Sequence, residues 1–460
     1  MHRTLLKGGT LISMVDGRKP FKADLLIEGG RIANIDANID VDAEIVDVSG
    51  HIVLPGFVDC HRHVWQAQLR AITHDWSLKD YIRSVRMRCG PQYRPEDMRI
   101  GNEAGMMEAM NAGITTVLDH CHNIPSPEHA EAALEGTFAS GIRSMFAFGL
   151  AGNYGVGQPF ELDERIKFIG ELRTRYFNSE KQLVQLGLNA SDSISLGHEQ
   201  LVKEVALARE LQLPVTLHAL VFMMPGLRTT FPSEIQVLSK AGLCLPNMVW
   251  VHMNFATQEE CQIVADSGGA IAVTPESEIQ MGMGHPCFVR AKKAGGEPCL
   301  GIDVVSNHSG CMFSQMRLAL QVERMLENDI ILAEAKAPEK ILPSSMDLLR
   351  AATVGGAKAL GLDAEIGTLE VGKQADVITL DGMGVGMAPV NDPVGATVLH
   401  AHPGAVSNVF VAGQAYKRDG ILLGPVKDLQ RKLCESSTRM FEEIERSGGL
   451  IEQPPMEFGF

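Results

Sequence analysis

The chain has 460 residues, of which 45% are hydrophobic and 21% are charged, and its formal net charge is −15 at pH 7. This composition is typical of a globular enzyme, and the length suits one large barrel with a smaller second domain. The acidic excess argues against a surface that follows nucleic-acid phosphates, so we expect a small-molecule substrate and no nucleic-acid partner.

Both ends of the chain predict short strands. Residues 1–55 alternate apolar stretches such as DLLIEGGRIANID with glycine turns, and residues 371–425 repeat this texture in ADVITLD and NVFVAGQAYKRDG. We therefore expect one discontinuous β-sandwich domain built from the two ends. The chain has no apolar run long enough for a membrane span and no signal-peptide pattern at its start, so we expect a cytoplasmic protein without membrane contact. Nine cysteines without a C-x-x-C pair favour reduced, buried thiols.

The middle of the chain, residues 56–370, alternates predicted strands with predicted helices. Helical periodicity is clearest in PEHAEAALEGTFASG, ELDERIKFIGELRTRYF and EQLVKEVALARELQL. Eight strand-helix units predict an α/β fold, a closed (β/α)8 TIM-type barrel. Residues 426–460 predict a helical tail used for packing or for contact within a homo-oligomer. The predicted barrel strands are Val53 to Cys60, Ile114 to Cys121, Ile142 to Leu150, Leu183 to Asn189, Leu213 to His218, Met248 to His252, Ala270 to Thr274 and Cys299 to Asp303.

The strongest local motif is PGFVDCHRH, an apolar strand that ends in His61 and His63. Side chains two apart on a strand share a face, so both imidazoles can point at one metal ion. A lone histidine is more often structural. Two on one face at the end of a barrel strand favour a metal site instead.

Three further residues close predicted barrel strands. His218 ends LPVTLH, His252 ends MVWVH and Asp303 ends CLGID. The carboxyl ends of barrel strands meet at the mouth, where the catalytic groups of this architecture gather. Three imidazoles and a carboxylate suit Zn²⁺, with Fe²⁺ or Mn²⁺ as alternatives.

These motifs together resemble the ATZ/TRZ branch of the amidohydrolase superfamily. They are PGFVDCHRH with QAQLRAI, the two strand-end histidines, GIDVVSN with MFSQMR, and AATVGGAKALGL with IGTLEVGKQADVITLD, spread over nearly the whole chain. The resemblance implies that His61, His63, His218 and Asp303 hold one divalent ion, with His252 beside it as an acid, base or polarising group. Such an ion can supply hydroxide at neutral pH, and Asp303 can take the proton of the water.

The sequence departs from this branch at two positions. Relatives with two metal ions carry a carboxylated Lys at the end of the fourth strand, whereas LVQLGLNASD has Asn189 and Ser191 there, which predicts a single ion. Aminohydrolases of this branch place a Glu three residues after the fifth-strand His, where this chain has Val221. Val221 cannot contact a ring nitrogen or relay protons, so ordinary ring deamination is expected to be weak.

Two carboxylates after the seventh strand are candidate replacements for that Glu. AVTPESE contains Glu276 and Glu278, and we place Glu276 ahead of Glu278 as a catalytic group, although a solvated loop residue is an equal alternative. In DHCHN, His120 and His122 share a face. His122 is a candidate for the pocket lining, with a structural hydrogen bond as the alternative.

The predicted pocket wall is apolar. Phe222 and Met224 flank Met223 after the fifth strand, and this run of large side chains suits an apolar or aromatic substrate, although core packing is the commoner role of such residues. The substrate-binding candidates are Trp65, Gln66, His122 and Met223.

The sequence therefore predicts a metal-dependent hydrolase that uses a metal-bound hydroxide on a non-peptide carbon–nitrogen bond of a small, largely apolar cyclic compound. One alternative is an ester, lactone or carbamate hydrolase with the same metal site. A second alternative is a catalytically inactive barrel that serves assembly.

Overall fold

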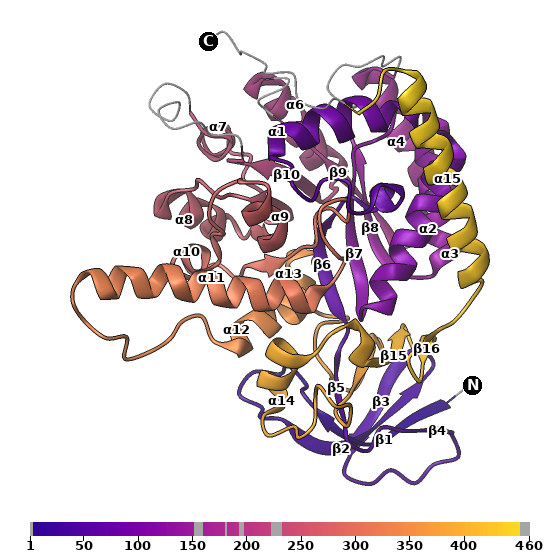
Figure 1. Ribbon diagram of the computed structural model, residues 1–460, viewed down its shortest axis with the longest axis vertical. Helices are drawn as coiled ribbons and strands as arrows, with labels where there is room; N and C mark the ends of the chain where they lie inside the picture. The colour runs from indigo at the N-terminus through magenta and orange to yellow at the C-terminus, as the bar shows by residue number, and fades with distance from the viewer. Residues whose placement is uncertain (1–2, 151–159, 180–181, 193–196, 222–231, 451–460) are drawn as a thin grey trace.

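A computed structural model of the chain describes residues 3–150, 160–179, 182–192, 197–221 and 232–450. Two sheets organise these residues, a parallel barrel and a separate mixed sheet (Figure 1). The expected architecture, a TIM-type barrel with a smaller β unit, is confirmed. Within the described ranges, none of the helices combines the length and apolarity that a membrane crossing requires.

Eight parallel strands form the barrel, and each pairs with its neighbour in chain order. The bond from Asp303 N to His61 O (2.8 Å) and that from His63 N to Asp303 O (2.9 Å) close the ring between its last and first strands. The strands are β6 (Phe57–Arg62), β7 (Ile114–Cys121), β8 (Arg143–Gly149), β9 (Val184–Asn189), β10 (Val215–Ala219), β11 (Met248–His252), β12 (Ala270–Val273) and β13 (Cys299–Leu300).

One predicted strand is wrong. The expected strand from Val53 to Cys60 is two strands, because the chain leaves the second sheet and enters the barrel at Gly56. A Cβ at Gly56 would lie 2.1 Å from Thr115 Oγ1, so only glycine fits this passage. The strand before it, β5 (His51–Pro55), pairs in the second sheet and not in the barrel.

Helices cover the outside of the barrel (Figure 1). The three helices predicted from periodicity are α3 (Pro127–Ser140), α4 (Leu162–Tyr176) and α6 (His198–Leu211). Helix α3 ends at Gly141, whose φ of +75° is left-handed, as is usual for a C-terminal cap. The others that matter below are α2 (Pro95–Asn111), α9 (Pro275–Gln280) and α11 (Met312–Ala333).

The second sheet joins the two ends of the chain. Strand β14 (Val377–Asp381) pairs antiparallel with β5, and this pairing brings the C-terminal strands beside the N-terminal ones. A buried ion pair from Arg143 to Asp376 (2.9 Å) ties the sheet to barrel strand β8. The remaining strands are β1 (Arg3–Leu11), β2 (Phe21–Glu28), β3 (Arg31–Asp36), β4 (Glu44–Asp47), β15 (Val406–Val411), β16 (Gln414–Arg418) and β17 (Ile421–Leu422).

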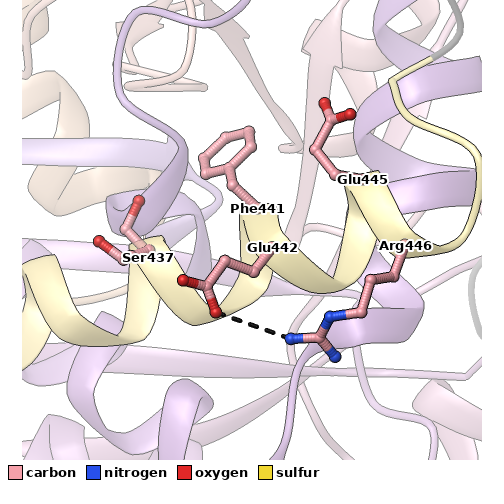
Figure 2. A pocket seen from close by; sticks show the side chains of 6 residues that line it. Ser437, Phe441, Glu442, Glu445 and Arg446 are labelled. Atoms are coloured by element: carbon pink, nitrogen blue, oxygen red, sulfur yellow. Dashed lines mark ion pairs between the residues drawn. The ribbon is translucent and has the colours of Figure 1, made fainter.

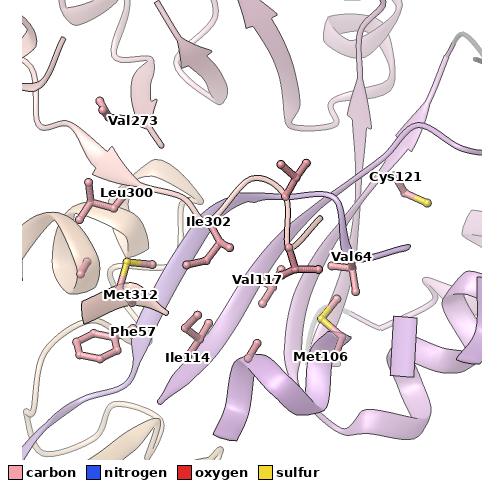
Figure 3. Close-up of a cluster of buried hydrophobic side chains, with 14 of the residues drawn as sticks. Phe57, Val64, Met106, Ile114, Val117, Cys121, Val273, Leu300, Ile302 and Met312 are labelled. Carbon is pink, nitrogen blue, oxygen red and sulfur yellow. The ribbon is translucent and has the colours of Figure 1, made fainter. Parts of the chain in front are cut away.

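Apolar side chains fill the base of the barrel. Phe57, Ile114 and Met312 are fully buried there, and Figure 3 shows them around the first strands. The Phe57 ring meets that of Phe313 edge-on, with centroids 5.1 Å apart. This packed base fixes the strands, so side chains at their carboxyl ends are held on a rigid frame.

The C-terminal helix α15 (Val426–Arg446) lies along α2 (Figure 1). Its inner face binds Asp97 of α2, which accepts from Ser436 Oγ (2.7 Å) and from Arg439 Nη2 (2.6 Å). Figure 2 shows its outer face, where Glu442 and Arg446 pair at 3.6 Å across one helical turn. The tail helix therefore packs on α2 and on the segment that follows the first barrel strand, where Ser437 Oγ donates to Gln68 O (2.8 Å).

Candidate metal centre

The structure brings the strand-end histidines and Asp303 together at the mouth of the barrel. His61 Nε2 lies 3.3 Å from His218 Nε2 and 3.3 Å from Asp303 Oδ1. His63 Nε2 also lies 3.3 Å from Asp303 Oδ1. Because the side chains come from β6, β10 and the end of β13, the closed barrel itself sets this spacing.

Two of these imidazoles are oriented through their other ring nitrogen. His63 Nδ1 donates to the backbone oxygen of His120 (2.9 Å), and His218 Nδ1 donates to Asp192 Oδ1 (2.8 Å). A proton on Nδ1 leaves the Nε2 lone pair of each ring directed at the cluster. Such outer contacts are usual for histidines that bind metal ions.

Strained backbone marks two of the strand ends. His252 and Asp303 have left-handed φ values of +72° and +68°. Non-glycine residues adopt this region rarely, and such strain gathers at functional sites where the surrounding fold enforces it. Gly301 supports the turn at Asp303, since a Cβ there would lie 2.9 Å from the Cβ and from the backbone oxygen of His61.

Burial sets the charge of the cluster. It lowers the pKa of His61 well below its ordinary value and also lowers the pKa of His63, so both rings are neutral. For Asp303, burial alone would raise the pKa, but the neighbouring His61 and His63 hold it well below its ordinary value. Neutral imidazoles beside an ionised carboxylate are the forms that bind a cation, so the residues fit a divalent metal ion.

His252 faces the cluster from β11. One atom each of His61, His252 and Asp303 lie within 4.8 Å of one another. His252 Nδ1 lies 3.0 Å from Thr274 Oγ1 and 3.3 Å from Glu278 Oε1. Glu278 is fully buried and also accepts from the backbone N–H of Thr274 (2.9 Å).

The structure gives the two glutamates different surroundings. Both lie on helix α9, not on a surface loop, and residues two apart on a helix point to different sides. Glu278 reaches His252, whereas the Glu276 carboxylate accepts from Gln315 Nε2 (3.0 Å) and lies 3.3 Å from His308 Nδ1. Burial raises the pKa of Glu276 to about 7. Among the described residues, Glu276 does not line the cavity at the cluster.

A small cavity of about 30 Å³ opens beside His63, His218 and Asp303. Its wall combines apolar and polar side chains, and Val221 forms part of the apolar side. The apolar lining residues are Leu78, Ile82, Val221, Met281, Met283 and Val304. Tyr81 and Arg86 add polar groups to this wall.

The four predicted substrate-binding residues take different places. Trp65 is fully buried against Tyr93, with ring centroids 4.9 Å apart, and it does not line the described cavity. Gln66 lies behind the wall, where its Nε2 donates to Tyr81 Oη (2.6 Å). The His122 ring is buried beside the His63 ring, with centroids 4.1 Å apart. Met223 lies outside the described residues.

The sequence interpretation missed Asp192, Tyr81 and Arg86. Asp192 lies three residues after the end of β9, the strand whose end carries no metal-bridging Lys. Its position near a strand end was the available signal. Tyr81 and Arg86 lie in the helical segment after the first strand, where no motif distinguishes them.

Known proteins are similar to this chain over most of its length. The model of the amidohydrolase family matches residues 52–416. A 5-methylthioadenosine/S-adenosylhomocysteine deaminase of Pyrococcus abyssi is 26% identical over 432 residues, which cover 91% of this chain and 95% of that protein. The corresponding protein of Teredinibacter turnerae is 27% identical over 378 residues, or 81% of each chain.

Solved structures share the fold along the chain. An adenosine deaminase from Xanthomonas campestris with bound zinc has a TM-score of 0.85 at 21% identity, covering 95% of this chain and 98% of that one. The atrazine chlorohydrolase TrzN from Arthrobacter aurescens, complexed with zinc, has a TM-score of 0.82 at 24% identity, covering 94% and 100%. The family match over most of the barrel, together with this fold, confirms the expected enzyme class, a hydrolase of non-peptide carbon–nitrogen bonds: the chain belongs to the amidohydrolase family.

Proposed function

We propose that this amidohydrolase uses one zinc ion to hydrolyse a carbon–nitrogen bond of a small, largely apolar cyclic compound. His61, His63, His218 and Asp303 would hold the ion. The observation that carries the proposal is the close approach of three imidazoles and one carboxylate. His61 Nε2 lies 3.3 Å from His218 Nε2, and Asp303 Oδ1 lies 3.3 Å from the Nε2 atoms of His61 and His63. Asn189 at the end of β9 supports a single ion, since its side chain donates to Ala147 O (2.9 Å) and offers no bridging carboxylate.

When bound, the ion would act as a Lewis acid and lower the pKa of water. The chain's own groups divide the proton transfers. Asp303 is ionised and lies at the centre of the cluster, so it can accept the proton of the attacking water. His252 stands across from it and would donate to the leaving group, a division of roles that acid-base catalysis requires.

Glu278 is the proposed positioning residue for His252. Its buried carboxylate lies 3.3 Å from His252 Nδ1 and favours an imidazole that carries its proton there. A cationic His252 would also be stabilised by this carboxylate during proton transfer. Glu278 therefore replaces Glu276 in the proposal, while the Glu276 carboxylate serves the contact with Gln315.

The cavity wall supports an apolar substrate, and it also favours a second candidate reaction. Val221 lines the cavity where related aminohydrolases of the resembled branch carry a Glu. Ester, lactone or carbamate hydrolysis needs no proton relay to a ring nitrogen, so the Val221 wall is compatible with it. The two relatives named as deaminases support the carbon–nitrogen reaction as the first candidate.

A substrate panel separates the two reactions. Purified zinc-loaded enzyme would be assayed against amides, ureas, aminated heterocycles, lactones and carbamates, with metal-depleted enzyme as the control. Zinc-dependent release of ammonia or amine supports the proposal. Turnover of lactones or esters alone would replace it with the second candidate.

We also propose a homo-oligomer in a reducing compartment. The far end of α11 projects from the barrel (Figure 1), and it exposes Met325, Ile330 and Leu332 by 54%, 60% and 56%. Such an apolar surface suits a subunit contact. All nine cysteines are unpaired, which supports the cytoplasm. Light scattering on wild type and Ile330→Glu tests the contact: a monomeric wild type would contradict it.

A further inference from the structure

His120 is a buried histidine that neither the sequence interpretation nor the proposed function uses. It lies on β7, next to the strand that carries His61, and only 2% of it is exposed. Its backbone oxygen accepts from His63 Nδ1 (2.9 Å), so its position is tied to a proposed ligand. One of its ring nitrogens lies within 4.8 Å of ligand atoms of His61 and His218.

The His120 ring is spaced like those of the proposed ligands. Its centroid lies 4.9 Å from that of His61 and 4.4 Å from that of His218. The proposed ligands stand at similar spacings, 4.7 Å for His61 and His63 and 5.0 Å for His61 and His218. Ligand atoms of His61, His120 and His218 also lie within 4.8 Å of one another. By these distances, His120 lies in the same cluster as the proposed ligands.

A purely structural role leaves part of His120 unexplained. Its Nδ1 is buried and has no hydrogen-bond partner among the described residues. Leaving a buried polar atom without a partner is unfavourable, so such atoms call for an explanation.

We propose that His120 is an additional protein ligand of the metal ion, beside His61, His63, His218 and Asp303. This inference rests on the proposed metal centre and deepens it. Zinc in catalytic sites usually takes three protein ligands and a water, so a larger set points to a more crowded coordination sphere.

His122 provides a matched control on the same strand side. It is also buried, at 3% exposure, and neither of its ring nitrogens has a partner among the described residues. Its ring packs beside that of His63, with centroids 4.1 Å apart, but it stands 6.4 Å from that of His218, against 4.4 Å for His120. Removing its imidazole should leave the ion's ligands in place.

The experiment uses Co²⁺ as the probe with the full chain. Metal-depleted wild type, His120→Phe, His120→Asn and His122→Phe would be titrated with Co²⁺, and the visible spectrum and Kd recorded. Near-UV circular dichroism identifies the variants that keep the native fold. We expect both His120 variants to change the Co²⁺ bands and to raise Kd at least about tenfold, the size of effect known for supporting residues of metal sites. His122→Phe should match wild type.

Each other result has a definite meaning. If wild type binds no Co²⁺, the proposed metal centre itself fails. If wild type binds Co²⁺ and a folded His120 variant has the same bands and Kd, His120 is not a ligand and only this inference fails. Equal changes in His120→Phe and His122→Phe would also overturn it, because they would report repacking of the strand.

Discussion

His61 and Asp303 meet twice, once through their backbones and once through their side chains. Asp303 N donates to His61 O at 2.8 Å, and Asp303 Oδ1 lies 3.3 Å from His61 Nε2. The first contact closes the barrel between its last and first strands. The same closure therefore sets the distance between two proposed metal ligands, which couples the integrity of the barrel to the metal site.

Gly301→Ala tests this coupling. The added Cβ would lie 2.9 Å from the His61 backbone oxygen, so the closing turn must shift. We expect a loss of about 1–3 kcal/mol in the free energy of unfolding, as for other overpacked sites, together with lower metal content. Gly170→Ala on helix α4 is the control, because its Cβ would meet nothing within 4 Å and should stabilise the helix slightly. Full metal content in Gly301→Ala would contradict the coupling.

Substituting a proposed ligand and substituting His252 should have different effects on metal content. Asp303→Ala removes the carboxylate that lies 3.3 Å from both His61 Nε2 and His63 Nε2, so metal content and activity should fall together. His252→Ala should lower activity by about 100-fold or more, the range of a general acid or base, while most of the metal stays bound. Elemental analysis beside a turnover assay checks both. Loss of the ion from His252→Ala would make His252 a ligand.

Glu278→Gln and Glu276→Gln distinguish the two glutamates of helix α9. Glu278 lies 3.3 Å from His252 Nδ1, so its loss should lower kcat and shift the pH profile of kcat, with less effect on KM. Glu276→Gln keeps a side chain that can still bond to Gln315 and should change kcat little. The pH profile matters, because a purely structural role of Glu278 would lower activity without moving it. A larger loss in Glu276→Gln would return that residue to the proposal.

The sequence predicts the barrel strands that carry the site better than it predicts the residues packed around the site. The strand ending at His252 is predicted with its observed bounds, since an apolar run before a polar residue defines a barrel strand well. The break at Gly56 was missed, because apolar residues continue across it and only the approach of Thr115 requires it. The sequence does not show that Glu278, and not Glu276, lies beside His252, because this depends on α9 being a helix. Asp192 becomes recognisable only through its contact with His218.

Glu323 on α11 should make stability depend on pH. It is 4% exposed, and burial raises the pKa of its carboxyl from 4.5 to about 7. Between these values the folded chain keeps a proton that the unfolded chain has lost, so the free energy of unfolding falls as pH rises and levels off above the folded pKa. In wild type this carboxyl should lower the free energy of unfolding by about 2 kcal/mol in total between about pH 5.5 and about pH 8, and Glu323→Gln should not show this fall.

Denaturant titrations of wild type and Glu323→Gln at each pH measure this difference. Asp329→Asn, which removes an exposed carboxylate of the same helix, controls for the lost charge. The expected change is confined to the Glu323 variant, because desolvation of a buried carboxylate is its cause. Parallel curves for wild type and Glu323→Gln would show that this carboxylate does not titrate with a raised pKa.

Val221 leads to the last prediction, which concerns ring deamination. It lines the cavity with apolar surface at the position where aminohydrolases of the resembled branch carry a proton-relaying Glu. Guanine, cytosine, adenosine and aminotriazines should therefore release ammonia weakly or not at all with wild type. Val221→Glu should raise that release, because a carboxylate beside the cluster can accept from a protonated ring nitrogen and pass the proton to the amine. Val221→Gln, similar in size but unable to carry a proton away, should not. Rapid ammonia release by wild type, unaffected by Glu278→Gln, would show that neither the absent Glu nor Glu278 governs the reaction.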